Sequence, residues 1–409
     1  MLDISLILLK KKYIIKCLNK RKFKNINLIS KVIFLYKKKK KINKKIIKYI
    51  KIIKKFSKNY FLINKAKRLK NYNFIKNTKK QKNIYINKIK KINNKIFNYI
   101  ILIPNIINKV YFKKKKKGII FNYKNKIKKN KKFYSHIELS KKFEIFNTKL
   151  ANNITSTGFV IYSGFGLKLY NALVRYFLKI NNDKGYKEYK LPYLVNEESL
   201  FGTGQYPEKK KQIYKIEKDN LYLIPTGEVP LINIFKNQLF NINDLPIKVQ
   251  TYTHCFRREA GSYGKKVKGL NRVHEFGKVE IIEICRISNS SKRLIKMKNH
   301  IKNILKSLNL NFRILLLPSY DLSLTSSITY DFEVFSIGQK IWLEVSSLSN
   351  CLNYQSYNLN IKYLKDKKKK YCHILNGSSL SIPRILAAII EQNQKDNYIK
   401  IPKVLLPFF

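Results

Sequence analysis

Acidic side chains are scarce in this sequence and almost missing from its beginning. Its 409 residues include 23 Asp and Glu against 87 Lys and Arg, which gives a formal net charge of +64. Asp3 is the only carboxylate side chain before Glu138, so this part of the chain can form almost no internal ion pairs. A field of this sign attracts polyanions. The excess of Lys over Arg, with many Asn, Ile and Tyr, is equally typical of an A+T-rich coding sequence, so the charge alone predicts no nucleic-acid partner.

Paired cysteines, long apolar runs and the common phosphate-binding loops are also lacking. The cysteines are Cys17, Cys255, Cys285, Cys351 and Cys372. Their odd number and the absence of a CxxC pair argue against a disulfide framework or a structural zinc site, and favour a reducing, cytoplasmic location. No apolar run approaches the ~20 residues of a membrane span, so no membrane partner is expected. Neither a P-loop motif nor GxGxxG after a strand occurs, which excludes those two modes of ATP binding.

The first 112 residues carry a helical repeat that predicts a hairpin arm. One apolar seam consists of Ile46, Tyr49, Ile53, Phe56 and Tyr60, and a second of Tyr85, Ile89, Ile92, Ile96 and Tyr99. Spacings of three and four residues are typical of coiled coils, and the polar stretch 64–73 between the seams predicts the turn. The outer faces are expected to be almost entirely Lys. The arm either lies along RNA phosphates, or is a solvated helical pair or partly disordered tail whose charge does nothing specific.

A change of composition near residue 135 separates this arm from the rest of the chain. Residues 113–132 are Lys-rich and predict a basic linker, with Gly118 as a breaker, while residues 133–409 predict one folded domain. Strands are expected at 220–224, 246–253, 278–285, 312–317, 330–335 and 341–346, and helices at 166–179, 290–308 and 383–393. No regular ladder of strand–helix units is present, which argues against a doubly wound parallel sheet. The predicted fold class is α+β, a large antiparallel sheet flanked by helices, with an N-terminal α-helical coiled-coil hairpin.

The densest group of chemically useful side chains lies in residues 255–281, CFRREAGSYGKKVKGLNRVHEFGKVEI. Arg257, at the end of a predicted strand, can clamp a phosphate or a carboxylate through two hydrogen bonds. Glu259 can accept from an amino group, and Phe276 offers a flat face to a base. An ordinary basic hairpin would explain the charge of the loop, but not the further segments before and after it that complete the same set of motifs.

This segment resembles motif 2 of the class II aminoacyl-tRNA synthetases, and the seryl enzymes in particular, in which FRxEAG, a GLxRxHxF turn and KVE follow at this spacing. Upstream, GYKEYKLPYLVNEESLFGTGQYP resembles motif 1, with Pro192 as the motif proline, and LYLIPTGEVPL resembles the serine-binding TxE strand. Downstream, WLEVSSLSNCLNYQ and LNGSSLSIPRILAAIIE resemble the ExSS segment and motif 3. The resemblance covers nearly the whole chain. It implies a class II catalytic domain at 133–409, a tRNA-binding arm at 1–112 and a homodimer.

The resemblance also implies a role for each matching side chain. The residues implied to bind serine are Thr226, Gly227, Glu228, Glu280, Asn376 and Ser378. Those implied to bind ATP are Arg257, Arg258, Glu259, Val273, His274, Glu275, Phe276, Glu344, Val345, Ser346, Ser347 and Arg384. Among them, Arg257, Glu259 and Arg384 are the implied catalytic residues. Glu344 and Ser347 are the implied ligands of a Mg²⁺ ion bound with ATP. Adenylation needs no covalent side chain, because its rate comes from alignment and from cations around the phosphates.

Several positions depart from the pattern of the resembled family. They are Arg258, Gly227, Ser379 and Pro383. Arg258 adds charge beside the phosphate clamp, and Gly227 is expected to loosen its strand by roughly 0.5–1 kcal/mol relative to alanine. Pro383 is expected just before a helix, where a missing N–H costs little. His274 is expected to be a structural hydrogen-bonding residue, and Trp342 a core residue.

The implied reaction is the ATP-dependent activation of L-serine and its transfer to the 3′ end of tRNA(Ser), with tRNA(Sec) left open as a second acceptor. One alternative is a related enzyme that loads a carrier protein, which predicts loss of the arm. Another is a non-catalytic RNA-binding relative, which predicts erosion of the charged site residues. Those residues, Arg257, Glu259, Glu280, Glu344 and Arg384, are all present. The expected ligands are ATP, Mg²⁺ and serine, the expected partners are tRNA and a second copy of the chain, and no DNA partner is expected.

Overall fold

The computed structural model describes residues 1–58, 65–113, 118–124, 133–207, 212–258 and 269–409. The chain divides into two compact units, Leu2–Pro104 and Asn105–Phe409, and Met1 belongs to the second. Within the described ranges, every helix is either too short or too polar to cross a bilayer.

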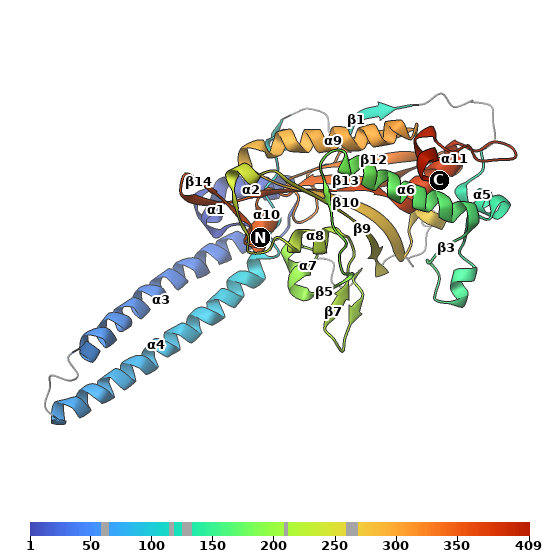
Figure 1. Cartoon of the computed structure of the whole chain (residues 1–409). Helices are drawn as coiled ribbons and strands as arrows, with labels where there is room; N and C mark the ends of the chain where they lie inside the picture. Colours follow the sequence, from blue (N-terminus) through green and yellow to red (C-terminus); the bar gives the residue numbers. More distant parts are fainter. Residues whose placement is uncertain (59–64, 114–117, 125–132, 208–211, 259–268) are drawn as a thin grey trace. The chain divides into compact units, whose positions relative to one another are not determined.

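The first unit is helical and contains the predicted hairpin (Figure 1). Its helices are α1 (Ile4–Leu9), α2 (Lys11–Lys20), α3 (Asn27–Lys58) and α4 (Lys65–Ile100). The long helices α3 and α4 pack through the two apolar seams: Tyr49 stacks on Tyr85 with ring centroids 5.7 Å apart, and Ile92 is buried. The seams meet because residues three and four apart share one face of a helix.

Helix α4 begins earlier in the chain than the sequence suggests. The predicted turn at 64–73 is wrong, because α4 already begins at Lys65. Polar residues of good helix propensity continue a helix when another stretch of it supplies the packing. Tyr60, the last member of the first seam, lies outside the described residues.

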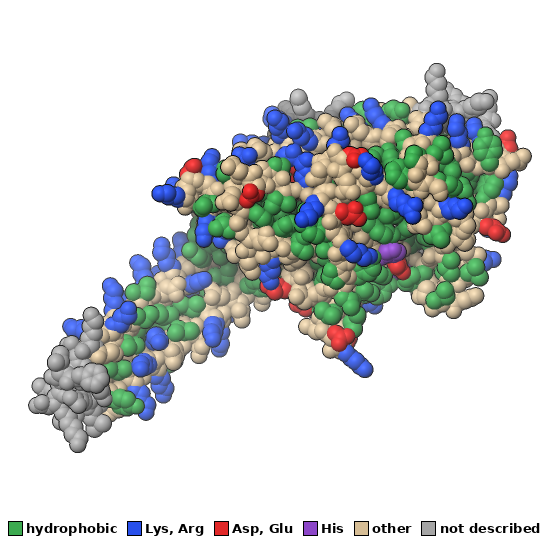
Figure 2. Space-filling view, in the orientation of Figure 1, with side chains coloured by type: hydrophobic (Ala, Val, Ile, Leu, Met, Phe, Trp, Pro, Cys, Tyr) green, Lys and Arg blue, Asp and Glu red, His purple; other side chains and the backbone are tan. Residues whose placement is uncertain are grey.

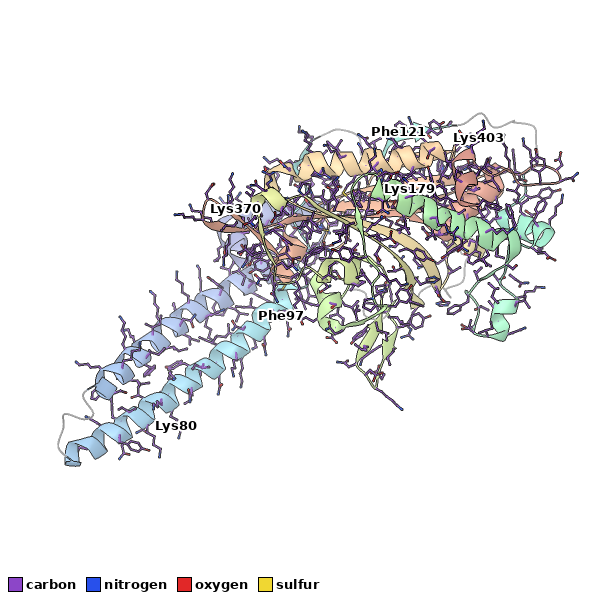
Figure 3. The ribbon with its side chains drawn as sticks, viewed as in Figure 1. Lys80, Phe97, Phe121, Lys179, Lys370 and Lys403 are labelled. Carbon is purple, nitrogen blue, oxygen red and sulfur yellow. The ribbon has the colours of Figure 1, made fainter. Side chains whose placement is uncertain are left out.

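Lys side chains are frequent on the outer faces of the hairpin, but these faces are not almost entirely Lys as predicted, because apolar side chains such as Phe34, Ile47 and Tyr72 are also exposed. In Figure 2 the Lys side chains are spread over the visible face of α3 and α4, and no carboxylate side chain occurs in either helix. Lys80 lies on the side of α4 that faces away from α3 (Figure 3).

The second unit is built on an eight-stranded sheet in the order β1-β11-β12-β13-β16-β10-β9-β4. Its strands are β1 (Gly118–Tyr123), β4 (Lys187–Glu188), β9 (Ile247–Phe256), β10 (Glu275–Cys285), β11 (Phe312–Leu316), β12 (Ile328–Ser336), β13 (Ile341–Asn350) and β16 (His373–Ser381). All neighbours are antiparallel except β4 and β9. The predicted α+β class with a large antiparallel sheet is confirmed.

Three strands of this sheet escape the sequence analysis: the two-residue β4, and the longer β16 and β1. β16 lies between β13 and β10, but its Asn, Gly and Ser residues have low strand propensity, so its pairing depends on its neighbours. β1 falls inside the predicted linker, where residues 118–123 pair with β11. The linker prediction is therefore wrong for this stretch: Gly118 begins a strand instead of interrupting the chain.

Helices cover one face of the sheet and leave the central strands open on the other. The main helices of this unit are α6 (Gly164–Asn182), α9 (Ser290–Ser307) and α11 (Ile382–Gln392) (Figure 1). Arg293 of α9 pairs with Glu283 of β10, and Ser379 of β16 donates a hydrogen bond to Asn181 of α6. Because side chains alternate along a strand, Glu280 of β10 points to the opposite face.

The other elements of this unit are short. The short helices are α5 (His136–Phe143), α7 (Glu197–Thr203), α8 (Glu228–Asn233) and α10 (Tyr354–Asn358). The remaining strands are β2 (Phe146–Asn147), β3 (Ile161–Tyr162), β5 (Leu194–Asn196), β6 (Lys215–Ile216), β7 (Leu221–Leu223), β8 (Leu239–Asn241), β14 (Lys362–Lys365) and β15 (Lys368–Tyr371). They form a two-stranded sheet, β2-β3, and two three-stranded sheets, β5-β7-β6 and β15-β14-β8.

Candidate active site

A cavity of about 700 Å³ opens on the uncovered face of the large sheet. Arg257 enters it from the end of β9, Glu344 from β13 and Arg384 from the first turn of α11, and Phe276 also lines it. The three charged groups that the sequence predicts around one nucleotide therefore share one cavity. Its volume suits a ligand of nucleotide size.

A second cavity, of about 340 Å³, adjoins the first. Among its lining residues are Thr226, Glu228, Glu280, Ser347 and Asn376. The two cavities share Arg257, Lys278, Glu344 and Ser378. A carboxylate in the smaller cavity and a phosphate in the larger one would therefore meet beside the cations of Arg257 and Lys278.

Glu280 is the buried anion of the smaller cavity. Its Oε1 accepts a hydrogen bond from Thr226 Oγ1 at 2.5 Å and pairs with Lys278 Nζ, which also donates to Thr226 Oγ1 at 3.1 Å. The side chains of Lys278 and Glu280 are 8% and 5% exposed. The sequence analysis does not assign a role to Lys278, although its place two residues before Glu280 in β10 puts both on one face.

Glu228, the second acid of this cavity, stands at the start of α8. Its Oε1 accepts from Gln355 Nε2 at 2.7 Å and from Asn376 Nδ2. Two amide donors fix the carboxylate and leave its charge facing the cavity. Gln355 is a further residue that the sequence analysis leaves without a role.

The TxE segment is not a strand, contrary to the prediction. The chain leaves β7 at Leu223, and Gly227 takes a helical φ of −63° as the residue that caps α8. A Cβ atom on Gly227 would lie 2.7 Å from Thr253 Oγ1. Glycine therefore makes room for a close approach of β9 here, and the expected loosening of a strand does not apply.

A bulge brings Glu344 and Ser347 to the same side of β13. Strand β12 pairs with β13 at Phe332↔Ser346 and at Glu333↔Glu344. Val345 is thus an extra residue without a partner on β12. Residues three apart face opposite sides of a regular strand, and one extra residue restores them to a common face. The ExSS spacing matches this local geometry.

The oxygen atoms around Glu344 fit a divalent cation. Asp331 lies opposite Ser347, and its Oδ1 is buried and has no hydrogen-bond partner among the described residues. Burial and the neighbouring Glu344 carboxylate raise the pKa of Asp331 to about 7, a sign of uncompensated negative charge. Across the described ranges, no three His, Cys, Asp or Glu side chains gather into a metal site. The carboxylate and hydroxyl oxygens of Asp331, Glu344 and Ser347 fit Mg²⁺, which takes its other ligands from phosphate and water.

The turn that leads into β10 forms a wall of the larger cavity. His274 fixes this turn: its N–H donates to Gly158 O, and its carbonyl accepts from Arg257 N–H, both at 2.8 Å. Its ring Nδ1 lies 2.9 Å from Tyr214 Oη and 2.9 Å from Arg257 O. These bonds agree with the structural role predicted for His274. The Arg257 guanidinium lies 5.1 Å from the ring centroid of Phe276, so it covers one face of the predicted adenine platform.

Some predicted site residues are not brought to the cavities. Arg258, Gly227, His274 and Glu275 line neither of them, whereas Val273, Val345 and Ser346 line the larger one. Glu259, predicted to contact ATP, lies outside the described residues. Pro383 falls within the first turn of α11 instead of before it, where the missing N–H is harmless.

Trp342 is not the core residue that the sequence predicts. It shares a face of β13 with Glu344, two residues on, so it is only partly buried and lines the larger cavity. The Arg313 guanidinium lies 4.4 Å from its ring centroid, and Arg313 also pairs with Glu333.

Comparisons with known proteins agree with this arrangement. The profile of the tRNA synthetase class II core domain (G, H, P, S and T) matches residues 213–393. The serine–tRNA ligase of Wigglesworthia glossinidia brevipalpis is 39% identical over 364 residues, which cover 83% of each chain. The chain belongs to the serine–tRNA ligase family. The family member from Methylacidiphilum infernorum is 44% identical over 278 residues, and the chain spans 66% of its length.

A solved structure of the family matches the whole chain. The seryl-tRNA synthetase from Pyrococcus horikoshii, complexed with ATP, superposes with a TM-score of 0.90 at 26% identity. The match covers 100% of this chain and 98% of that one. Family membership agrees with the resemblance found in the motifs and rests on sequence and fold together.

Proposed function

We propose that this chain activates L-serine with ATP and transfers the serine to the 3′ end of tRNA(Ser). The observation that carries the proposal is the junction of the two cavities, where Arg257, Lys278, Glu344 and Ser378 line both. A nucleotide in the larger cavity and a small amino acid in the smaller one would place their reacting groups at this junction. Serine–tRNA ligase relatives and an ATP-complexed structural neighbour support the choice of substrates.

In the first step, a serine carboxylate oxygen attacks the α-phosphorus of ATP, the bond from that phosphorus to the bridging oxygen breaks, and pyrophosphate leaves. Arg257 and Lys278 offset the negative charges of the two reactants as they approach. Alignment of the reactants supplies much of the remaining rate, because no side chain becomes covalently attached. Mg²⁺ held by Glu344 and Ser347 would neutralise charge on the phosphates.

In the second step, a hydroxyl of the terminal tRNA ribose attacks the carbonyl carbon of seryl-adenylate, and AMP leaves. The smaller cavity offers polar partners for serine, since Thr226 and Glu280 lie side by side at its wall. A site with buried polar groups rejects an analogue that leaves them unpaired, so alanine should be a poor substrate. Threonine would be excluded by lack of room for a methyl group.

The decisive experiment is ATP–pyrophosphate exchange by the purified chain with serine, alanine or threonine. Exchange should depend on serine and on Mg²⁺. Charging of tRNA(Ser) should follow under the same conditions, and tRNA(Sec) can be compared with it as a second acceptor. A folded protein without serine-dependent exchange would overturn the proposal. Exchange without charging of tRNA would favour an enzyme that loads a carrier protein.

Two further features belong to the proposal. We place two copies in the working enzyme, because residues 185–207 resemble motif 1; light scattering of the purified protein tests the molecular mass. All five cysteines are buried and none forms a disulfide, which suits a reducing compartment such as the cytoplasm. Localisation by fluorescence microscopy of the tagged chain tests that placement.

A further inference from the structure

We infer that His136, outside both cavities, positions the wall of the nucleotide cavity through a buried hydrogen bond to the backbone N–H of Leu270. The inference rests on the proposed function for its meaning, since that cavity is the one assigned to ATP. His136 begins α5, and its side chain is fully buried. Leu270 and the next residue, Asn271, line the larger cavity and form part of its wall.

The partners of His136 indicate which of its ring nitrogens donates and which accepts. Its Nδ1 lies 2.7 Å from Glu391 Oε1, a carboxylate oxygen that can only accept, so Nδ1 carries the proton. Its Nε2 lies 3.1 Å from the N–H of Leu270 and must therefore accept. A neutral imidazole with its proton on Nδ1 satisfies both contacts. Protonation of Nε2 would remove the acceptor of the Leu270 N–H.

Glu391 anchors the histidine firmly. Its side chain is fully buried and accepts from the N–H of His136 at 2.8 Å, from Ser336 Oγ at 2.6 Å and from the N–H of Gly338 at 3.0 Å. A buried carboxylate with this many donors is held in one orientation. The imidazole is therefore a rigid link between the last turn of α11 and the cavity wall.

Helix α11 thus holds two successive residues of the wall from its two ends. Arg384, in its first turn, donates Nε to the carbonyl of Asn271 at 2.9 Å, while Glu391, in its last turn, acts on the N–H of Leu270 through His136. A Cβ atom on Gly269 would lie 2.4 Å from His136 Nε2. The wall therefore approaches the imidazole as closely as a glycine allows.

Two substitutions separate the two bonds of His136. In His136→Asn, the amide nitrogen can still donate to Glu391 from near the Nδ1 position, but no acceptor reaches Leu270. In His136→Gln, the longer side chain brings an amide oxygen near the Nε2 position, and Glu391 Oε1 keeps the N–H of His136 as a donor. A buried N–H without an acceptor is costly, so the wall should loosen in the first variant and be restored in the second.

The experiment measures KM for ATP and KM for serine separately in pyrophosphate exchange. His136→Asn should raise KM for ATP roughly tenfold, with little change in KM for serine, and His136→Gln should bring KM for ATP back to within roughly threefold of the native value. The matched control is His300→Gln, which alters another buried, hydrogen-bonded histidine and should leave the ratio of the two KM values unchanged. Equal changes in both KM values, or the same KM for ATP in both His136 variants, would overturn the inference.

Hydrogen exchange of the native chain tests the bond without turnover. The amide of Leu270 should exchange slowly in the absence of ATP, in peptides that cover residues 269–273. His136→Asn should lose this protection, and a non-hydrolysable ATP analogue should restore it. Fast exchange of this amide in the native protein contradicts the inference, even if neither variant folds. Absence of serine-dependent exchange in the native chain would instead count against the proposed function alone.

Discussion

Lys278 and Glu280 form a buried ion pair at the place where the two cavities meet. Removal of one member of such a pair leaves an uncompensated charge, whereas removal of both charges is much better tolerated. Both side chains also hydrogen-bond to the hydroxyl of Thr226, which donates to Glu280 and accepts from Lys278, so loss of the pair would disturb the smaller cavity directly. The effects of these two charges on the activity of the enzyme and on the stability of its fold can therefore be separated by comparing single and double variants.

Lys278→Met should lower kcat/KM for serine by at least about a hundredfold and destabilise the fold by roughly 3 kcal/mol, because Glu280 stays buried without its cation. The double variant Lys278→Met with Glu280→Gln should regain most of the stability but none of the activity. Denaturant unfolding and pyrophosphate exchange measure the two effects. A double variant as unstable as the single one would contradict the argument.

Two buried histidines should make the fold sensitive to acid. Burial lowers the pKa of His300 and of His373 to about 4 from an ordinary value of 6.5, and nearby Lys184 and Lys248 add to the shift at His300. Both are neutral in the folded state, so their contribution to stability is complete above pH 6.5 and is lost as the pH falls towards 4.

Each histidine should cost on the order of 3 kcal/mol of unfolding free energy over that interval. Denaturant unfolding at several pH values measures how steeply the unfolding free energy falls with decreasing pH. His300→Gln and His373→Gln should each make this dependence on pH weaker. If neither variant changes the slope, the acid sensitivity comes from the carboxylates instead.

At the scale of secondary-structure elements, the sites depend on departures from regular geometry. The bulge at Val345 places two oxygen ligands on one face of β13, and the tight junction of β7 and α8 places Glu228 in the smaller cavity. Sequence motifs predict the residues involved, but a strand was predicted where the chain turns into α8. Glycine at position 227 allows that turn to pack against β9.

Gly227→Ala should raise KM for serine several-fold and destabilise the fold by about 1 kcal/mol, since its Cβ would press on Thr253 Oγ1. The backbone is not the cause, because φ at this residue is −63° and suits alanine. Combination with Thr253→Ala removes the atom that is contacted and should restore both quantities. Kinetics with serine and thermal unfolding of the two variants provide the test, and an unrelieved defect in the double variant would argue against it.

At the scale of the whole molecule, the question is how much of the charge of +64 serves binding. The hairpin has no carboxylate side chain, but Lys is also abundant elsewhere, as expected from biased composition. Salt dependence separates the two origins, because each Lys that displaces a counterion from RNA contributes to the slope of affinity against salt.

Replacement of Lys80, Lys88 and Lys95 on α4 by Gln should weaken tRNA binding and reduce the salt slope by up to roughly 2. Pyrophosphate exchange, which needs no tRNA, should not change. The control replaces Lys292, Lys296 and Lys306, exposed residues of α9, and should have little effect. Filter binding of tRNA(Ser) over a range of salt gives the slopes. Equal slopes for both sets would assign the arm's charge to composition.

The sequence by itself determined the helical hairpin, most strands of the large sheet and the main charged residues of the site. These features depend on local periodicity and on motifs of fixed spacing, which can be recognised in the sequence without knowledge of tertiary contacts. Tertiary structure alone decided the central position of β16, the exposure of Trp342, the place of Lys278 in the wall of both cavities, and the hydrogen bond from Gln355 to Glu228. It also decided the buried link from Glu391 through His136 to Leu270. Strand pairing and side-chain burial depend on contacts between residues that are far apart in the chain, so they cannot be predicted from a short stretch of sequence.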